Sequence, residues 1–248
     1  MLTIQSGRFN RVFGGNNLGG NITGTITVNI EETGCHPIII GQLFGGGNQA
    51  AYTAPSGKHG PTVNVKSFTS IGEVYGGGYG AGAIVKGDTY VNIDVCMGEN
   101  ASAETSETTA HTNQWIHFVA GKNPDDSDKI VTVWQPEHTP GSIGTIGNVF
   151  GGGNEAGVDG NTNVQIGLLE YVEITSNIVA GTTDVRGYYT LSGTTYTEVT
   201  GNSAVPAVAN TKYYKKVIGA NITGNVYGGG NAAVVTGDTN VKIGTKEQ

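Results

Sequence analysis

The chain has 248 residues, of which 42 are glycine and only 13% are charged. Its formal net charge of −7 leaves no visible basic face, so neither nucleic acid nor a strongly anionic polysaccharide is expected as a partner. No apolar run reaches the roughly 18 residues of a membrane-inserted segment, and the length suits one continuous domain over residues 1–248.

From the N-terminus onward, one pattern recurs: an apolar strand ending in an aromatic residue, a Gly-Gly-Gly-Asn corner and a second, alternating strand. In the C-terminal copy, Thr239, Val241 and Ile243 alternate with Asn240 and Lys242, which predicts a β-strand. Five copies are marked by the aromatic residues Phe13, Phe44, Tyr75, Phe150 and Tyr227, and four of them by the corner residues Asn16, Asn48, Asn154 and Asn231. Tyr79 replaces asparagine in the third copy.

The spacing of the aromatic residues gives the period. Phe13 to Phe44 is 44 − 13 = 31 residues, and Phe44 to Tyr75 is 75 − 44 = 31. The next interval is 150 − 75 = 75 residues, which becomes 31 after removal of the 44 residues 99–142. The last is 227 − 150 = 77 residues, which becomes 31 after removal of the 46 residues 171–216. A period of this size indicates a repeat array with two insertions.

One copy cannot bury its apolar face alone, so the copies are expected to stack as a parallel β-solenoid, each strand pairing with its counterpart in the next copy. The corner glycines are expected to supply positive φ angles. The aromatic and asparagine rows then become structural ladders, with a solvent-facing sugar platform as the alternative role for the rings.

These Gly-Gly-Gly-Asn repeats resemble the right-handed parallel β-helix repeats of large, adhesin-like bacterial surface proteins. The resemblance implies an extracellular or cell-surface location and a glycan or surface-protein partner. The N-terminus, MLTIQSGRFN, shows no secretion signal and starts almost inside a copy, which indicates a piece of a longer protein.

The first insertion, residues 99–142, opens with a polar, acidic stretch. Residues 114–119 and 129–134 then alternate as two strands, and Asn123–Asp128 reads as the turn between them. A hairpin is therefore predicted, and it carries both tryptophans of the chain, Trp115 and Trp134.

The second insertion, residues 168–217, contains three predicted strands at residues 187–191, 194–199 and 212–217. Three strands can form a small antiparallel module. This module carries five of the 11 tyrosines, namely Tyr188, Tyr189, Tyr196, Tyr213 and Tyr214.

Flat aromatic rings suit sugar rings and protein partners, and binding residues concentrate on segments held by a rigid scaffold. The two tryptophans and five tyrosines are therefore the ligand-binding candidates. The alternative is that each insertion needs its rings for its own small core. The repeats are expected to stay folded without either insertion.

No catalytic constellation is recognised. Asp94 is the clearest strand-borne acid, whereas Asp88 and Asp238 occupy a corner that Asn161 also fills. Neither a metal site nor a cofactor motif is found. The leading interpretation is a non-catalytic, adhesin-like segment that displays its insertions for glycan or protein binding. The alternative is a carbohydrate-active β-helix enzyme or a phage tailspike fragment.

The two cysteines, Cys35 and Cys96, follow equivalent strands about two periods apart. Their copies would lie about 10 Å apart, beyond the reach of a disulfide unless the loops lean together. Two unpaired thiols are expected.

Overall fold

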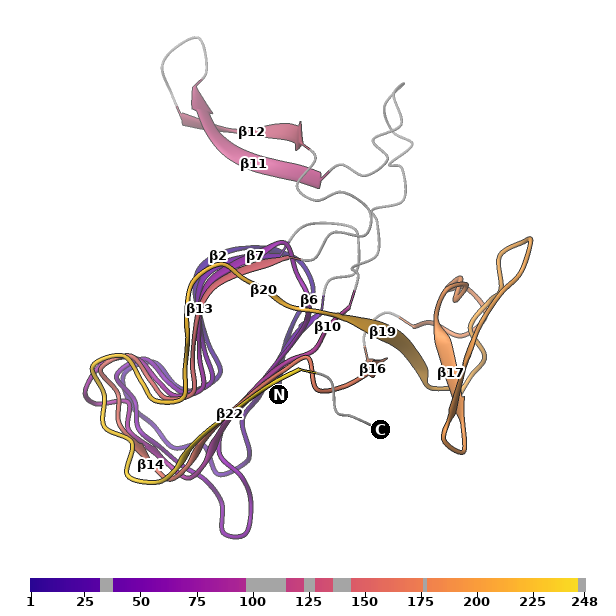
Figure 1. The fold of residues 1–248 in the computed structure, drawn as a ribbon. Helices are drawn as coiled ribbons and strands as arrows, with labels where there is room; N and C mark the ends of the chain where they lie inside the picture. The colour runs from indigo at the N-terminus through magenta and orange to yellow at the C-terminus, as the bar shows by residue number, and fades with distance from the viewer. Residues whose placement is uncertain (32–37, 97–114, 123–127, 136–143, 176–177, 245–248) are drawn as a thin grey trace.

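The computed structural model describes residues 1–31, 38–96, 115–122, 128–135, 144–175 and 178–244 (Figure 1). Throughout these ranges the fold is all-β, with parallel sheets and no helix. In particular, these ranges hold no helix with the length and hydropathy to cross a bilayer.

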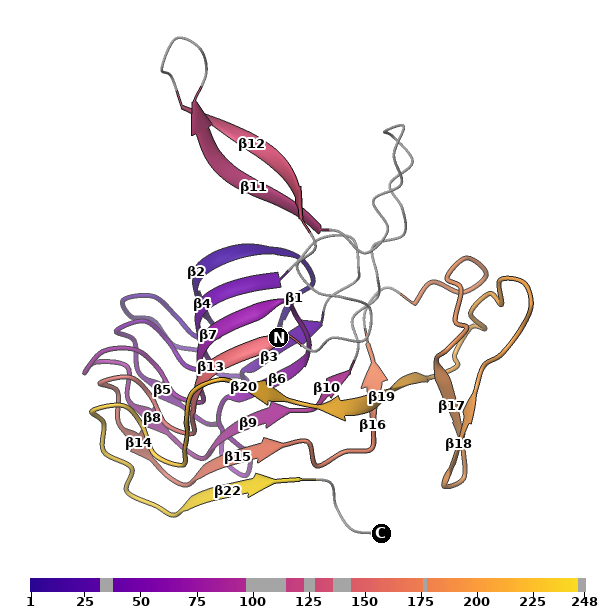
Figure 2. The ribbon, with the colours of Figure 1, turned by 45° about the horizontal axis from the view of Figure 1, so that its top comes forward.

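Sheet 1 is built from the alternating second strand of each copy, and all of its strands are parallel (Figure 2). The register is that of the repeat, because Val164 pairs with Val91 on one side and with Val241 on the other. In spatial order the strands are β1 (Leu2–Ile4), β3 (Thr27–Glu31), β6 (Thr62–Ser67), β9 (Thr89–Ile93), β15 (Thr162–Ile166) and β22 (Thr239–Ile243).

Sheet 2 is built from the strands that precede the Gly-Gly-Gly corners, and these also pair in parallel. Its strands are β2 (Gly7–Phe13), β4 (Ile38–Phe44), β7 (Ser70–Tyr75), β13 (Thr145–Phe150), β20 (Asn221–Ile222) and β21 (Val226–Tyr227). A short sheet 3 lies between sheets 2 and 1 in chain order, with parallel strands β5 (Tyr52–Thr53), β8 (Val85–Lys86) and β14 (Val158–Asp159).

The two insertions form antiparallel structures outside these sheets (Figure 1). In the first, β11 (Trp115–Lys122) and β12 (Asp128–Gln135) pair as a hairpin. The second contributes to a five-stranded sheet, here called the side sheet, which is larger than the three-stranded module predicted for residues 168–217. Its strands are β10 (Val95–Cys96), β16 (Tyr171–Ile174), β17 (Tyr189–Ser192), β18 (Thr195–Glu198) and β19 (Tyr213–Gly219).

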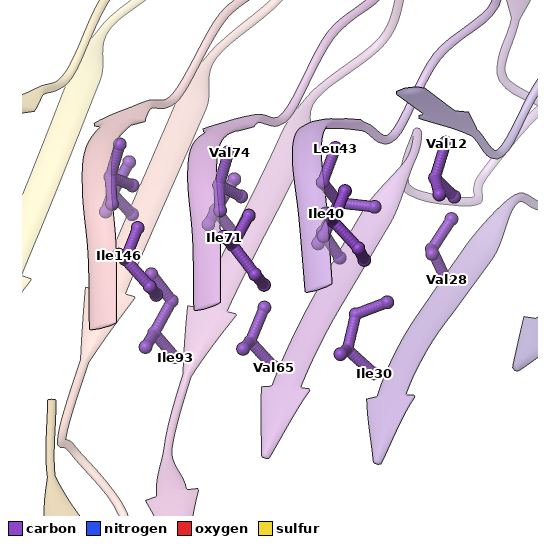
Figure 3. Packing of buried hydrophobic residues seen from close by; sticks show 14 of the residues in the cluster. Val12, Val28, Ile30, Ile40, Leu43, Val65, Ile71, Val74, Ile93 and Ile146 are labelled. Atoms are coloured by element: carbon purple, nitrogen blue, oxygen red, sulfur yellow. The ribbon is translucent and has the colours of Figure 1, made fainter. Parts of the chain in front are cut away.

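The main core lies between sheets 1 and 2. Side chains such as Ile40 and Ile71 point from sheet 2 toward Ile30 and Val65 of sheet 1 (Figure 3). Strand alternation explains the arrangement, since Val63 and Val65 are fully buried while Asn64 between them faces outward. Each of the first four copies adds one layer of buried apolar residues to the same core.

The positive φ angles expected at the corner glycines occur at Gly87 (131°), in the corner before β9, but not in the Gly-Gly-Gly corners. Positive φ occurs just beyond them, at Gln49 (53°), Glu155 (56°) and Ala232 (50°). Glycine is needed for another reason: a Cβ on Gly76 would collide with the carbonyl oxygen of Gly151 in the next copy. The corners are therefore glycine because neighbouring backbones approach too closely for any side chain.

The five aromatic residues at the ends of the sheet 2 strands stack ring on ring. Successive ring centroids are 4.9, 4.7, 4.7 and 4.7 Å apart, and successive planes differ by at most 10°. This spacing matches that of neighbouring strands, so the backbone register sets the stack. The rings form a cluster separate from the main core, in which Phe44 and Tyr75 are fully buried. These rings are therefore a buried stack, and only Tyr227 at its end is largely exposed.

The corner asparagines form a broken row. Asn231 donates its side-chain amide to Asn154 Oδ1 at 3.2 Å, and the backbones of Asn48, Tyr79 and Asn154 pair in parallel. At the N-terminal end the amide of Asn48 donates to Asn17 Oδ1 at 2.7 Å, while Asn16 takes part through its backbone carbonyl. The side-chain hydrogen bond that was predicted for Asn16 is thus made by Asn17 instead.

Candidate functional site

One face of the side sheet carries a cluster of tyrosines. Tyr189 lies directly across from Tyr214, and the pairing of β16 with β19 brings Tyr171 onto the same face. The rings of Tyr171 and Tyr196 stack with centroids 4.0 Å apart, and Tyr171 also contacts Tyr189 at 4.9 Å. Tyr214 meets Tyr196 edge-on at 5.1 Å. We call these four half-buried residues the tyrosine face.

The tyrosine hydroxyls on this face are uncharged but polar. Burial, followed by the nearby Glu198 carboxylate, raises the pKa of Tyr189. Burial and the neighbouring tyrosines and acids likewise raise the pKa of Tyr196. Both hydroxyls therefore remain protonated at physiological pH and can donate hydrogen bonds. At the rim, Lys212 pairs with Glu173 at 2.9 Å.

The other two tyrosine candidates lie on the opposite face. Tyr188 and Tyr213 are 4% and 3% exposed and pack with Val185 and Ala207 in a small core. They therefore match the alternative in which the insertion uses its rings for its own core. Tyr171 was missed as a candidate, although the alternation through Val172 could have placed it on the tyrosine face.

The tryptophan candidates lie on the first hairpin. The register pairs Trp115 with Gln135 and Trp134 with Ile116. Their side chains lie outside the described part of the structure, so their role as ligand-binding candidates stays a prediction.

Residues 168–175, here called the crossing segment, run from the end of β15 past the ends of neighbouring sheet 1 strands (Figure 2). Asp94 Oδ1 accepts hydrogen bonds from the backbone N–H groups of Leu168 and Leu169, at 3.0 and 3.1 Å. The second insertion is therefore anchored on the third copy through Asp94, the clearest strand-borne acid in the sequence.

Two further copies hold the same segment. Lys66 Nζ donates to the carbonyl oxygen of Glu173 at 2.6 Å and pairs with Glu31 at 2.9 Å. Glu31 in turn accepts from the backbone N–H of Thr175 at 3.0 Å. In addition, β19 pairs with β10, which extends the third copy. The repeats therefore contact this insertion, and the expectation that they stay folded without it stays a prediction.

The burial of Asp94 is expected to make the stability of the protein depend on pH. Burial raises its pKa above the ordinary value, and its two hydrogen bonds to backbone N–H groups offset this only in part. An acid with a raised folded-state pKa loses stability as pH rises through that value. We therefore expect Asp94→Asn to gain in thermal midpoint, relative to the wild type, between about pH 3 and about pH 7. Melting curves at both pH values test this, with exposed Asp238→Asn as the control. A difference that is flat or shrinks with pH would contradict it.

Cys96 carries a free thiol that is 2% exposed, while Cys35 lies outside the described residues. Burial raises the pKa of the Cys96 thiol to about 11, so little thiolate forms at neutral pH. In a Cys35→Ser variant we expect a thiol reagent to label the native protein far more slowly than the urea-unfolded protein. Equal labelling rates in the two states would show that Cys96 is accessible.

Among the residues that the structure describes, no group of three or more His, Cys, Asp or Glu side chains is arranged to hold a metal ion. Comparisons with family models, curated proteins and solved structures each found no match. The role of the chain must therefore be inferred from its own residues, above all from the tyrosine face and the junction beneath the crossing segment.

Proposed function

We propose that this chain is a non-catalytic segment of a right-handed parallel β-solenoid of the adhesin-like, cell-surface type. Its repeats act as a rigid spacer, and its insertions bind glycan or protein partners. No nucleic-acid contact and no direct membrane insertion belong to this role.

The parallel sheets support the solenoid part of the proposal. The chain visits sheet 2, sheet 3 and sheet 1 in that order in its second, third and fourth copies, and each strand pairs with its counterpart one copy away. The common ring spacing along the aromatic stack fits successive layers of one continuous structure. The right hand comes from the resemblance to bacterial β-helix repeats.

The tyrosine face is the feature that supports the proposed role in binding. Its four rings are held on paired strands, so little side-chain freedom is lost when a ligand stacks on them. Phenolic hydroxyls at the edges can bond to sugar hydroxyls or to a protein backbone. The repeats, by contrast, stack their rings against one another in a buried cluster.

A glycan array tests the proposal with matched variants of the full chain. Tyr196→Ala removes a ring from the centre of the face, and we expect it to weaken binding by about tenfold or more, the equivalent of about 1.4 kcal/mol. Tyr90→Ala removes a comparably half-buried tyrosine from sheet 1 and should bind as the wild type does. Equal binding by the wild type and Tyr196→Ala would move the site elsewhere, and a wild type that binds no glycan would remove the glycan role.

A further inference from the structure

A cavity of about 190 Å³ lies between the outer face of sheet 1 and the crossing segment. Its sheet side is lined by Asn64, Asn92 and Gln165, which come from three successive copies. Leu169 and Val172 of the crossing segment form the opposite wall. Both the repeats and the second insertion are therefore needed to build it.

The sheet side exposes hydrogen-bonding groups because an amide ladder stops there. Asn64 donates to Asn29 Oδ1 at 2.9 Å, and Asn92 donates to Asn64 Oδ1 at 2.9 Å. Gln165 occupies the next place in the row but, within the described residues, its side chain makes no hydrogen bond. The carbonyl oxygen of the Asn92 side chain likewise accepts none there. The cavity is thus lined by an acceptor and a complete amide that a ligand can satisfy.

The charged residues Lys66 and Asp94 also line the cavity. They differ in which of their hydrogen-bonding atoms are available to a ligand. Lys66 already bonds to Glu31, to the carbonyl of Glu173 and to Thr175 Oγ1. Asp94 uses only Oδ1 for the crossing segment, so its Oδ2 stays available as an acceptor in the described structure. An anionic ligand would face this carboxylate without a spare cation to balance it.

We propose that this cavity binds a single neutral sugar ring. Asn92, Gln165 and Asp94 would bond to its hydroxyls, and the apolar wall would cover its C–H face. The volume would hold about six waters, which suits one sugar ring. The proposal rests on glycan binding as the role of the segment, but it uses a site different from the tyrosine face.

The test is ligand-observed saturation-transfer NMR on the full chain, with D-glucose, D-galactose, D-mannose and N-acetylglucosamine as probes and D-glucuronic acid as the charged comparison. We expect at least one neutral sugar to bind. Leu169→Trp should fill the cavity mouth and weaken binding by about tenfold or more, and Gln165→Leu should also weaken it. Leu18→Trp, which enlarges an exposed leucine in the corner of the first copy, should have no effect.

Tyr196→Ala separates this proposal from the preceding one, because it damages the tyrosine face and leaves the cavity intact. Neutral-sugar binding that survives Tyr196→Ala but not Leu169→Trp supports the cavity site even if the glycan array is blank. The cavity site is overturned if none of the neutral sugars binds the wild type, if Leu169→Trp and Gln165→Leu bind as the wild type does, or if glucuronic acid binds as well as the neutral sugars.

Discussion

Replacing Lys66 with methionine is expected to destabilise the protein by about 3–5 kcal/mol. The side chains of Lys66 and Glu31 are only 11% and 2% exposed, so the substitution removes an ammonium group from beside a buried carboxylate. It also removes the ammonium group that bonds to the carbonyl of Glu173. Both changes weaken the contacts that hold the crossing segment against the repeats.

Urea denaturation of the variant measures this loss, and Lys86→Met provides the control because Lys86 lies exposed on β8. The double variant Glu31→Leu with Lys66→Met should recover part of the loss, since an apolar pair avoids the stranded charge. A single variant as stable as the control would show that the ion pair is dispensable.

Truncation of an internal ring of the aromatic stack, Phe44→Ala, is expected to cost about 3–5 kcal/mol. Phe44 is fully buried between Phe13 and Tyr75 and also meets Tyr79 edge-on, so its removal opens a cavity and breaks three ring contacts at once. The expected result is a large fall in the urea midpoint.

Tyr227→Ala is the matched comparison at the end of the same stack. Tyr227 is 45% exposed and stacks on Phe150 alone, so its loss should cost only about 1 kcal/mol. Similar losses for both variants would mean that position in the stack does not matter.

The period and the strand pairing were predictable because their signals are local. Alternation within Thr162–Ile166 and Thr239–Ile243 identifies inward residues, and equal spacing aligns one copy with the next. The role of glycine in the Gly-Gly-Gly corners was mispredicted because it depends on a neighbouring copy. A single corner gives no indication of how closely the next backbone approaches.

The anchoring of the second insertion is a contact over long sequence separation, and Glu31 and Thr175 are 144 residues apart. One signal could have indicated it. Directly after the last apolar residue of the sheet 1 strand, the first three copies carry Glu31, Lys66 and Asp94, whereas the last two carry Gly167 and Gly244. A charge at one position in only some copies marks those copies for a contact outside the array.

The face of the side sheet on which each tyrosine lies was only partly predictable. Adjacent tyrosines in an extended strand point to opposite faces, so Tyr188 and Tyr189 could not share one surface. Which face becomes buried depends on Val185 and Ala207, which close the small core from other parts of the insertion. Composition alone therefore overestimated the number of available rings.

The crossing segment also determines how mechanical load passes through the molecule. In an array whose copies touch only their neighbours, tension across the strands can open one interface at a time. Here the crossing segment forms hydrogen bonds with Glu31, Lys66 and Asp94, one in each of the first three copies. Separating any two of these copies must therefore also break some of these hydrogen bonds. We therefore expect the first three copies to resist tension together, and the fifth copy, which the crossing segment does not contact in the described structure, to separate first.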